Sequence, residues 1–403
     1  MTETLSLPRT EGTGAARPRL YAALVAMMVM SFVLVTAEFL PNGVLIELAD
    51  ALGVTPGQAG QTVTATALVG VIVAPTIGML VPRLDRRTLL VWLAAIAAVS
   101  NLLVAIAPNL LTVLAARVLL GAALSGFWAM SLVVSARIAG PERLGRAVMF
   151  TTAGVSLATV IGVPLGVFFS TVLDWRAVFA AAAVLTVAVA VALRALLPEV
   201  PAQAGAGLAV LRGALRHPGV ALGLAGHVLI VFGHFVAYTY IRLALERVTL
   251  GGGGAPLDEG AIVLMLGLFG VGGLVGNAIT AAVVDRWLAP LSTAVPLLVA
   301  APVVAVLLWP QSVVAAGVAV FVWGMSFAAW LIVLNTWIGR RLPDRLEAGG
   351  GLVVVGFQLA ISLAAGFGGL LIDGAGVGAA YATGAVAIAV GAVTFGIAGR
   401  AGR

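Results

Sequence analysis

An acidic residue lies inside the first long apolar run of the sequence. Glu38 follows a nearly continuous stretch of apolar residues that begins near Leu20. A carboxyl group in hydrocarbon is costly, and in membrane proteins it commonly marks an ion or substrate pathway. Burial favours the neutral form of a carboxyl and a nearby cation favours the charged form, so a group held between them can load and release a proton. The other interpretation is a water-exposed acid at the outer end of the span, because Glu38 lies roughly 27 Å along a helix from Leu20.

A basic residue lies at a comparable depth in the fourth apolar run. If that run starts near Leu110 at the outer face, Arg117 lies roughly 10 Å below the face, at a level similar to that of Glu38. An arginine in this position needs an anion, a backbone acceptor or a water-filled cavity. We therefore predict a switchable Glu38–Arg117 pair, the alternative being a packing arginine bonded to backbone carbonyls. His234 can titrate near neutral pH and is the alternative proton carrier.

Polar and aromatic residues within the apolar runs are candidates for substrate contact. His234, Tyr238 and Arg242 recur at i, i+4 and i+8, so we expect them on one helical face, where they could stack on a flat ring and bond its edge. The other candidates are Asn42, Phe127, Trp128, Tyr240, Asn335, Trp337 and Gln358.

Depth within the spans separates these candidates. Trp128 and Gln358 lie deepest in their apolar runs and are the preferred two. For Tyr240 and Trp337 the alternative is the aromatic belt that membrane proteins carry at the ends of their spans.

Missing residue types exclude several classes of chemistry. The chain has no cysteine, and all 22 of its basic residues are arginine. It therefore lacks thiolate nucleophiles and thiolate metal sites, the lysine of a P-loop and the lysine of a Schiff base. The three histidines give only a weak metal signal. We expect no cofactor, no metal and no enzymatic activity, since a membrane enzyme would need histidines and acids clustered at one membrane face.

The composition indicates that this chain folds in a lipid bilayer and not in water. Of its 403 residues 62% are hydrophobic and only 9% are charged, whereas soluble domains have about 25% charged residues. Helices of about 20 residues that cross the bilayer fit these figures. The predicted spans are 20–44, 58–81, 89–107, 110–134, 147–170, 177–197, 219–242, 260–283, 289–309, 312–337, 349–372 and 377–398.

The arginines indicate the orientation of these twelve spans. With the N-terminus in the cytoplasm and the sides alternating, 18 of the 22 arginines fall in cytoplasmic segments. This is the positive-inside bias, so the sequence predicts cytoplasmic N- and C-termini in the inner (cytoplasmic) membrane. The net charge of +6 therefore reflects topology and not a nucleic-acid partner.

The longest internal connector divides the chain into two halves of six spans. The predicted segments are a flexible cytoplasmic tail at 1–18, an N-terminal six-helix bundle at 19–197, a cytoplasmic linker at 198–218 and a C-terminal six-helix bundle at 219–403. The halves look like repeats, because at an offset of 203 residues Gly121 falls on Gly324. Weakly similar halves are typical of secondary transporters whose substrate binds near the midplane.

Several motifs now coincide in the expected spans. The loop after the second span reads Gly78-Met-Leu-Val-Pro-Arg-Leu-Asp-Arg-Arg87, the fourth span contains Arg117-Val-Leu-Leu-Gly121, and the fifth contains Gly154 and then Gly162-Val-Pro-Leu-Gly166. Together they resemble the major facilitator superfamily (MFS), and within it the twelve-span drug:proton antiporters. Stretches such as Thr36-Ala-Glu-Phe-Leu-Pro41 are similar to those of its purine-nucleoside exporters.

The resemblance implies roles for particular residues. The arginine of the fourth span is implicated in proton coupling, and the glycine- and proline-rich stretch of the fifth span shapes a bent, closely packed helix. The loop motif departs from the family pattern, with Pro82 in place of an aspartate; Asp85 could substitute for the lost acid. The expected conformational residues are Gly78, Asp85, Arg86, Arg87, Gly154, Gly162, Pro164, Gly166, Asp285 and Arg286.

These observations together predict an all-α membrane protein that exports small molecules in exchange for protons. The leading substrates are purine ribonucleosides or related ring compounds, followed by drugs of the chloramphenicol type or sugars. A monomer in the lipid bilayer is expected. A non-transporting receptor or scaffold is the rival from another class, and it would not need Glu38 within a span.

Overall fold

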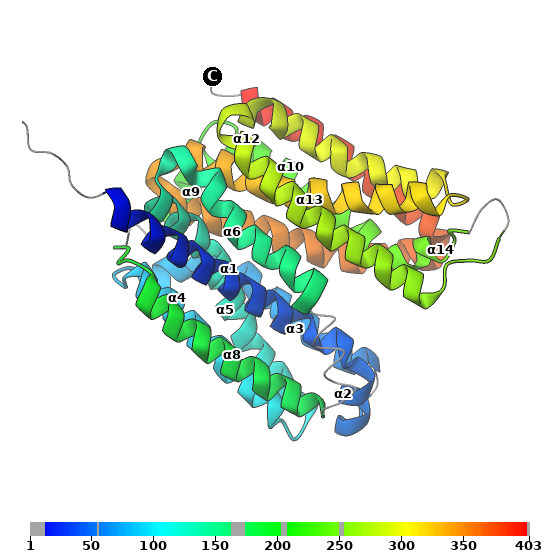
Figure 1. The fold of residues 1–403 in the computed structure, drawn as a ribbon, viewed down its shortest axis with the longest axis horizontal. Helices are drawn as coiled ribbons and strands as arrows, with labels where there is room; N and C mark the ends of the chain where they lie inside the picture. Colours follow the sequence, from blue (N-terminus) through cyan, green and yellow to red (C-terminus); the bar gives the residue numbers. More distant parts are fainter. Residues whose placement is uncertain (1–12, 55, 163–173, 203–207, 250–253, 401–403) are drawn as a thin grey trace, which may run out of the picture.

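The computed structural model describes residues 13–400 except positions 55, 163–173, 203–207 and 250–253, and it is built of helices (Figure 1). Ten of these helices are long and apolar enough to cross a membrane. One of the ten, Gly260–Leu308, contains two spans, and the shorter apolar helix Ala65–Leu80 adds a further one. The twelve transmembrane helices predicted from the sequence are therefore confirmed.

The helices follow the apolar runs. In the first half they are α1 (Thr13–Gly43), α2 (Leu45–Leu52), α3 (Pro56–Leu80), α4 (Arg86–Ala105), α5 (Leu110–Ala139), η1 (Pro141–Arg143), α6 (Leu144–Leu157), the π-helix η2 (Ala158–Gly162) and α8 (Trp175–Leu196). The segment expected to be a linker contains α9 (Leu208–Leu215). In the second half they are α10 (Val220–Tyr238), α11 (Ile241–Leu245), α12 (Glu259–Leu308), α13 (Val313–Arg341), η3 (Pro343–Arg345) and α14 (Leu346–Arg400).

Polar residues at the predicted breaks fix where several helices begin. The side chains of Asp85, Asn109, Asp174, Asp258 and Ser312 each accept a hydrogen bond from a backbone N–H in the first turn of the helix that follows. The first N–H groups of a helix have no partner within the helix, so such caps stabilise its start by about 1 kcal/mol. These caps fix the first residues of five of the helices.

Two predicted loops are replaced by kinks. The eighth and ninth spans form one helix, α12, interrupted only at Trp287, where the backbone is not helical. The eleventh and twelfth spans form α14, interrupted at Gly376 with a φ of +79°. That conformation costs glycine little and other residues much, so one glycine reverses the chain where the sequence suggested a short loop.

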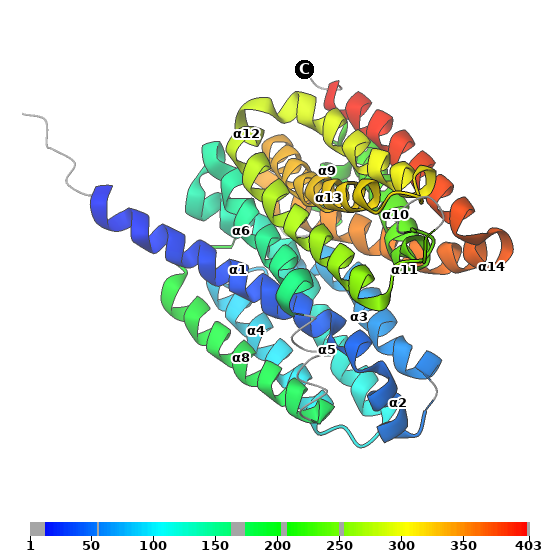
Figure 2. The same cartoon turned by 45° about the vertical axis from the view of Figure 1, so that its right-hand side comes forward.

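The helices form two bundles that lie side by side (Figures 1 and 2). In the first, α4 packs on α5 and α8, and α1 packs on α6 and α8. In the second, α10 packs on α14 and α12 packs on α13. Each bundle has its own apolar core, and they meet where α14 contacts α3 and α5 and where α12 contacts α6.

The bundles approach each other at the end where α9 lies, and their helices diverge toward the opposite end (Figure 1). Loops rich in arginine lie at the closed end. There the backbone N–H of Arg86 donates to the carbonyl oxygen of Val200, and the side chain of Arg341 donates to the carbonyl oxygen of Pro218. We call this the arginine-rich end, defined by residues 81–87, 197–201, 216–219 and 339–345. It is the end that the sequence predicts to face the cytoplasm.

A pair of glycine contacts supports the repeat. A side chain at Gly121 on α5 would overlap the carbonyl oxygen of Thr66 on α3, and one at Gly324 on α13 would overlap that of Phe269 on α12. Positions 66 and 269 are separated by the same 203 residues as positions 121 and 324. The same close helix approach therefore occurs at equivalent positions of both halves.

Gly324→Ala is expected to lower the free energy of unfolding by about 3 kcal/mol or more, because the added methyl group would overlap backbone atoms of Phe269, which cannot move aside easily. Gly317→Ala on the same helix is the control: there the added methyl meets only flexible side chains at 3.6 Å, so we expect a small change. Thermal unfolding of both purified variants in one detergent measures the difference. Equal melting temperatures would show that α12 and α13 do not need this approach.

Candidate functional site

Arg117 is buried between the helices of the first bundle. Its side chain is fully inaccessible, Nη1 donates a hydrogen bond to the carbonyl oxygen of Ala37 on α1 at 2.8 Å, and the guanidinium carbon lies 5.2 Å from the ring centre of Phe179. Nε and Nη2 have no hydrogen-bond partner among the described residues. A buried guanidinium whose Nε and Nη2 lack acceptors is unfavourable, and a nearby anion can stabilise it.

Glu38 is the anion within reach. It follows Ala37 directly on α1, is half-buried, and interacts electrostatically with Arg117. No ion pair of 4.0 Å or less joins these two described residues. The structure thus places Glu38 and Arg117 near each other but without a direct ion pair.

His234 lies in an aromatic cluster of the second bundle. Its Nδ1 accepts the indole N–H of Trp323 at 3.0 Å, and its ring stacks on Phe327 and Tyr238 with centroids 3.4 and 5.2 Å away. An indole nitrogen only donates, so Nδ1 carries no proton and the imidazole is neutral in this arrangement. The geometry therefore disfavours His234 as a proton carrier and suits it to stacking.

A second histidine repeats this arrangement one heptad away. His227 Nδ1 accepts the indole N–H of Trp330 at 3.4 Å, and its Nε2 lies 3.2 Å from the carbonyl oxygen of Val353. His227 and His234 are seven residues apart on α10, and Trp330 and Trp323 are seven apart on α13. The histidines thus join two antiparallel helices, and the described residues include no group of three His, Cys, Asp or Glu side chains placed to hold a metal ion.

The proposed face of the seventh span is shorter than predicted. Helix α10 ends at Tyr238, and Arg242 belongs to the separate helix α11, where it is exposed and pairs with Glu246 at 3.0 Å. His234 and Tyr238 do share a face, but Arg242 does not continue it. Thr239 and Tyr240 form a turn, so the helix ends before it reaches Arg242.

Gln358 lies where the two bundles meet. It is buried on α14, and its Nε2 donates to the carbonyl oxygen of Ala67 on α3 at 3.2 Å. At the other junction, Asn277 of α12 donates to Ser156 Oγ of α6 at 3.2 Å. These polar contacts link opposite halves, so each must change when the bundles move relative to each other. Ser156 and Asn277 are functional candidates that the sequence did not reveal.

The remaining predicted substrate residues are scattered. Phe127 is fully buried in the core of the first bundle, and Trp128 is half-buried against it with ring centroids 5.5 Å apart. Asn335 donates to the carbonyl oxygen of Leu331 in its own helix. Tyr240 is half-buried beside Gly368. The side chain of Asn42 lies outside the described residues.

The loop after α3 holds the two bundles together at the arginine-rich end. Arg86 is fully buried; its Nε and Nη2 each donate to the carboxylate of Glu347, on the first turn of α14, at 2.6 Å. Its Nη1 donates to the carbonyl oxygens of Val81 and Leu84. This bidentate pair joins residues 261 positions apart in the two halves, and we call it the Arg86–Glu347 latch.

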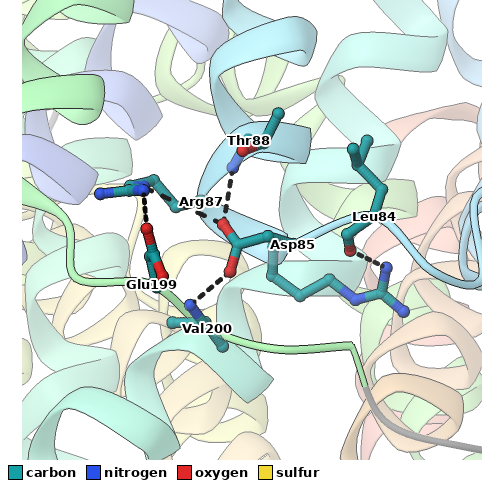
Figure 3. A network of polar contacts seen from close by, with 7 residues as sticks. Leu84, Asp85, Arg87, Thr88, Glu199 and Val200 are labelled. Atoms are coloured by element: carbon teal, nitrogen blue, oxygen red, sulfur yellow. Dashed lines mark hydrogen bonds and ion pairs between the residues drawn. The ribbon is translucent and has the colours of Figure 1, made fainter.

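Asp85 organises the same loop from inside the first bundle (Figure 3). One carboxylate oxygen accepts from Thr88 N and caps α4, while the other accepts from Val200 N at 2.7 Å. Arg87 pairs with Glu199 at 2.7 Å. Asp85 therefore provides the cap that we expected it to supply in place of the missing family aspartate.

The equivalent loop of the second half uses different partners. Arg340 Nη2 donates to the carboxylate and the backbone carbonyl of Asp285, at 3.1 and 2.7 Å. Arg286 is exposed, with its guanidinium carbon 5.8 Å from the ring centre of Trp287. Asp285 and Arg286 thus make no latch across the bundles. Gly78, the first motif residue, is buried.

The fifth span begins as the α-helix α6 and continues as the π-helix η2. A side chain at Gly154 would overlap the carbonyl oxygen of Met28, so α6 and α1 approach closely there. Gly162 ends η2. Pro164 and Gly166 lie outside the described residues.

The fold and these sites define a multi-pass membrane transporter built of two six-helix bundles. The sequence profile of the Major Facilitator Superfamily matches residues 27–365, and the chain belongs to this superfamily.

The chain is also similar to curated bacterial exporters. It is 32% identical over 363 residues to the purine ribonucleoside efflux pumps NepI of Salmonella paratyphi B and Salmonella enteritidis, covering 90% of this chain and 90% of each relative. The proton:xylose symporter XylE shares its fold at a TM-score of 0.73 and 14% identity, over 94% of this chain and 95% of that one. The human organic anion transporter MFSD10 does so at 0.72 and 15%, over 95% and 100%.

Proposed function

We propose that this chain exports purine ribonucleosides, or related ring compounds, in exchange for protons across the cytoplasmic membrane. Export would proceed by alternating access, with both termini in the cytoplasm. The Glu38–Arg117 arrangement is the observation that carries the proton-coupling part of the proposal. The similarity to NepI over most of both chains supports the substrate class.

Proton coupling follows from the unsatisfied groups of Arg117. A charged Glu38 can pair with its unused Nε and Nη2 donors, and protonation of Glu38 removes that attraction. The state of the carboxyl therefore changes how strongly α1 is held to α5. In the proposed cycle, a proton from outside neutralises Glu38 and favours the empty return, whereas release inside favours loading of substrate.

Ring-shaped substrates suit the aromatic and hydroxyl side chains that both bundles supply. Trp128, Tyr238 and Phe327 are aromatic and half-buried, and buried hydroxyls of Thr62 and Ser125 have no hydrogen-bond partner among the described residues. Flat rings bind by stacking and ribose hydroxyls bind by hydrogen bonds, so this mixture matches a nucleoside better than a purely apolar drug.

A substrate panel in everted membrane vesicles tests the proposal. With the vesicle interior acidified, inosine, adenosine, arabinose and chloramphenicol are added in turn, and loss of the interior proton gradient is recorded by a pH-sensitive dye. We expect release of protons with the purine nucleosides, and none in vesicles that lack the protein.

The same panel separates the rival interpretations. Proton release with chloramphenicol or arabinose alone would overturn the nucleoside assignment but keep the exchange mechanism. If no compound releases protons and labelled inosine shows no counterflow in proteoliposomes, the proposal of nucleoside transport is wrong.

A further inference from the structure

A large cavity opens at the arginine-rich end, on the side of the second bundle. Its volume is about 1080 Å³, and it is lined by the end of α13, the last turns of α14 and the part of α12 that follows the kink at Trp287. These segments belong to the second bundle, and His217 of the linker segment completes the lining. The cavity is therefore distinct from the path between the bundles that transport would use.

The walls of this cavity are strongly basic. Its lining includes Arg286, Arg340, Arg341, Arg345 and Arg400 together with one acid, Asp344. Arg340 is neutralised by Asp285, and Arg341 donates to the last carbonyls of α14. Arg286, Arg345 and Arg400 are exposed, so the excess of positive charge forms an open, concave surface that attracts anions.

A buried donor in the cavity wall lacks an acceptor. Trp337 lines the cavity with its ring only 4% exposed, and its Nε1 has no hydrogen-bond partner among the described residues. An indole N–H in this position costs free energy unless a ligand accepts from it. Nε1 is itself inaccessible to solvent, so an oxyanion bound among the arginines supplies that acceptor once the ring turns toward the cavity.

Apolar surface next to the cavity indicates where the rest of the ligand lies. Trp287 precedes the cavity residue Leu288, Ile397 follows the cavity residue Gly396, and both Trp287 and Ile397 are 53% exposed. They lie at the ends of two membrane spans, where the hydrocarbon meets the headgroup layer. An acyl chain can lie against them while a phosphate enters the cavity.

We propose that this cavity binds the phosphate headgroup of an anionic phospholipid. Basic pockets between transmembrane helices on the side predicted here as cytoplasmic suit such lipids. The proposal does not depend on the transported substrate, because the site lies outside the junction of the bundles.

Native mass spectrometry of the full-length protein in a delipidating detergent tests this site. Dioleoyl phosphatidylglycerol is titrated against dioleoyl phosphatidylcholine. We expect one phosphatidylglycerol to bind about tenfold more tightly than phosphatidylcholine, and this preference should be lost in the variant R345Q/R400Q. Trp337→Phe should weaken binding of phosphatidylglycerol while keeping the aromatic packing.

The matched control is R143Q/R146Q, which removes two exposed arginines from the first bundle. It should bind phosphatidylglycerol like the wild type. An equal loss in this control, or unchanged binding by R345Q/R400Q, would overturn the proposal. Binding of inorganic phosphate without any preference for phosphatidylglycerol over phosphatidylcholine would also overturn it, since the cavity would then hold a soluble anion and not a lipid.

Discussion

Glu38→Gln is expected to abolish proton-driven export while leaving substrate binding measurable. Glutamine has nearly the same shape but cannot take up a proton, so the switch at Arg117 would stay in one state. At 100 mV, the inward movement of one proton supplies about 2.3 kcal/mol, or roughly a fortyfold concentration gradient. The variant should lose this gradient entirely when uptake of labelled inosine is followed in everted vesicles.

Glu47→Gln is the matched control for this substitution. Glu47 is an exposed acid on the neighbouring helix α2, so its loss should leave uptake and its pH dependence unchanged. Binding of inosine to both purified variants shows that each is folded. Full, pH-dependent export by the Glu38→Gln variant would contradict proton coupling through this residue.

The Arg86–Glu347 latch predicts the second large effect. Arg86 is fully buried, and the Glu347 side chain is 10% exposed, so removing the guanidinium takes the bidentate partner from a largely buried carboxylate, at a cost of about 3–5 kcal/mol. Arg86→Gln should therefore favour states in which the arginine-rich end is open. The chain has no native cysteine, so one reporter cysteine in place of buried Ala74, beside Gly351, can measure this opening.

Maleimide labelling of the reporter should become roughly a hundredfold faster when Arg86 is replaced. Arg87→Gln is the control, because Arg87 lies in the same loop but pairs with the exposed Glu199 of its own half. The exchanged variant R86E/E347R should recover part of the slow labelling. If Arg86→Gln labels no faster than the wild type, the latch does not hold the bundles closed.

Sequence reasoning identified residues whose chemistry is unusual for their surroundings. Glu38 and Arg117 were recognisable because each places a charge inside an apolar run, and equal depth along antiparallel spans placed them together. Local chemistry and helix geometry were sufficient in these cases.

Partners distant in the chain were not predictable in the same way. Glu347 lies in a short polar break, where an acid ordinarily contacts water, and nothing in its neighbourhood indicates Arg86. Trp323 and Trp330 were hidden among other apolar residues, although their seven-residue spacing from each other and the matching spacing of His227 and His234 carry the signal. Such pairings depend on how whole helices pack, which a single sequence does not specify.

The seven-residue spacing in the second bundle has a mechanical consequence. Glycines 226 and 233 of α10 lie against the backbone at glycines 391 and 384 of α14, again one heptad apart, so indole, imidazole and glycine layers all repeat with the same period. Helices locked in this register resist sliding past each other. We expect the C-terminal half to rotate as one rigid body during alternating access. The bending that this cycle requires should then occur in the fifth span of the other half, which contains the π-helix η2.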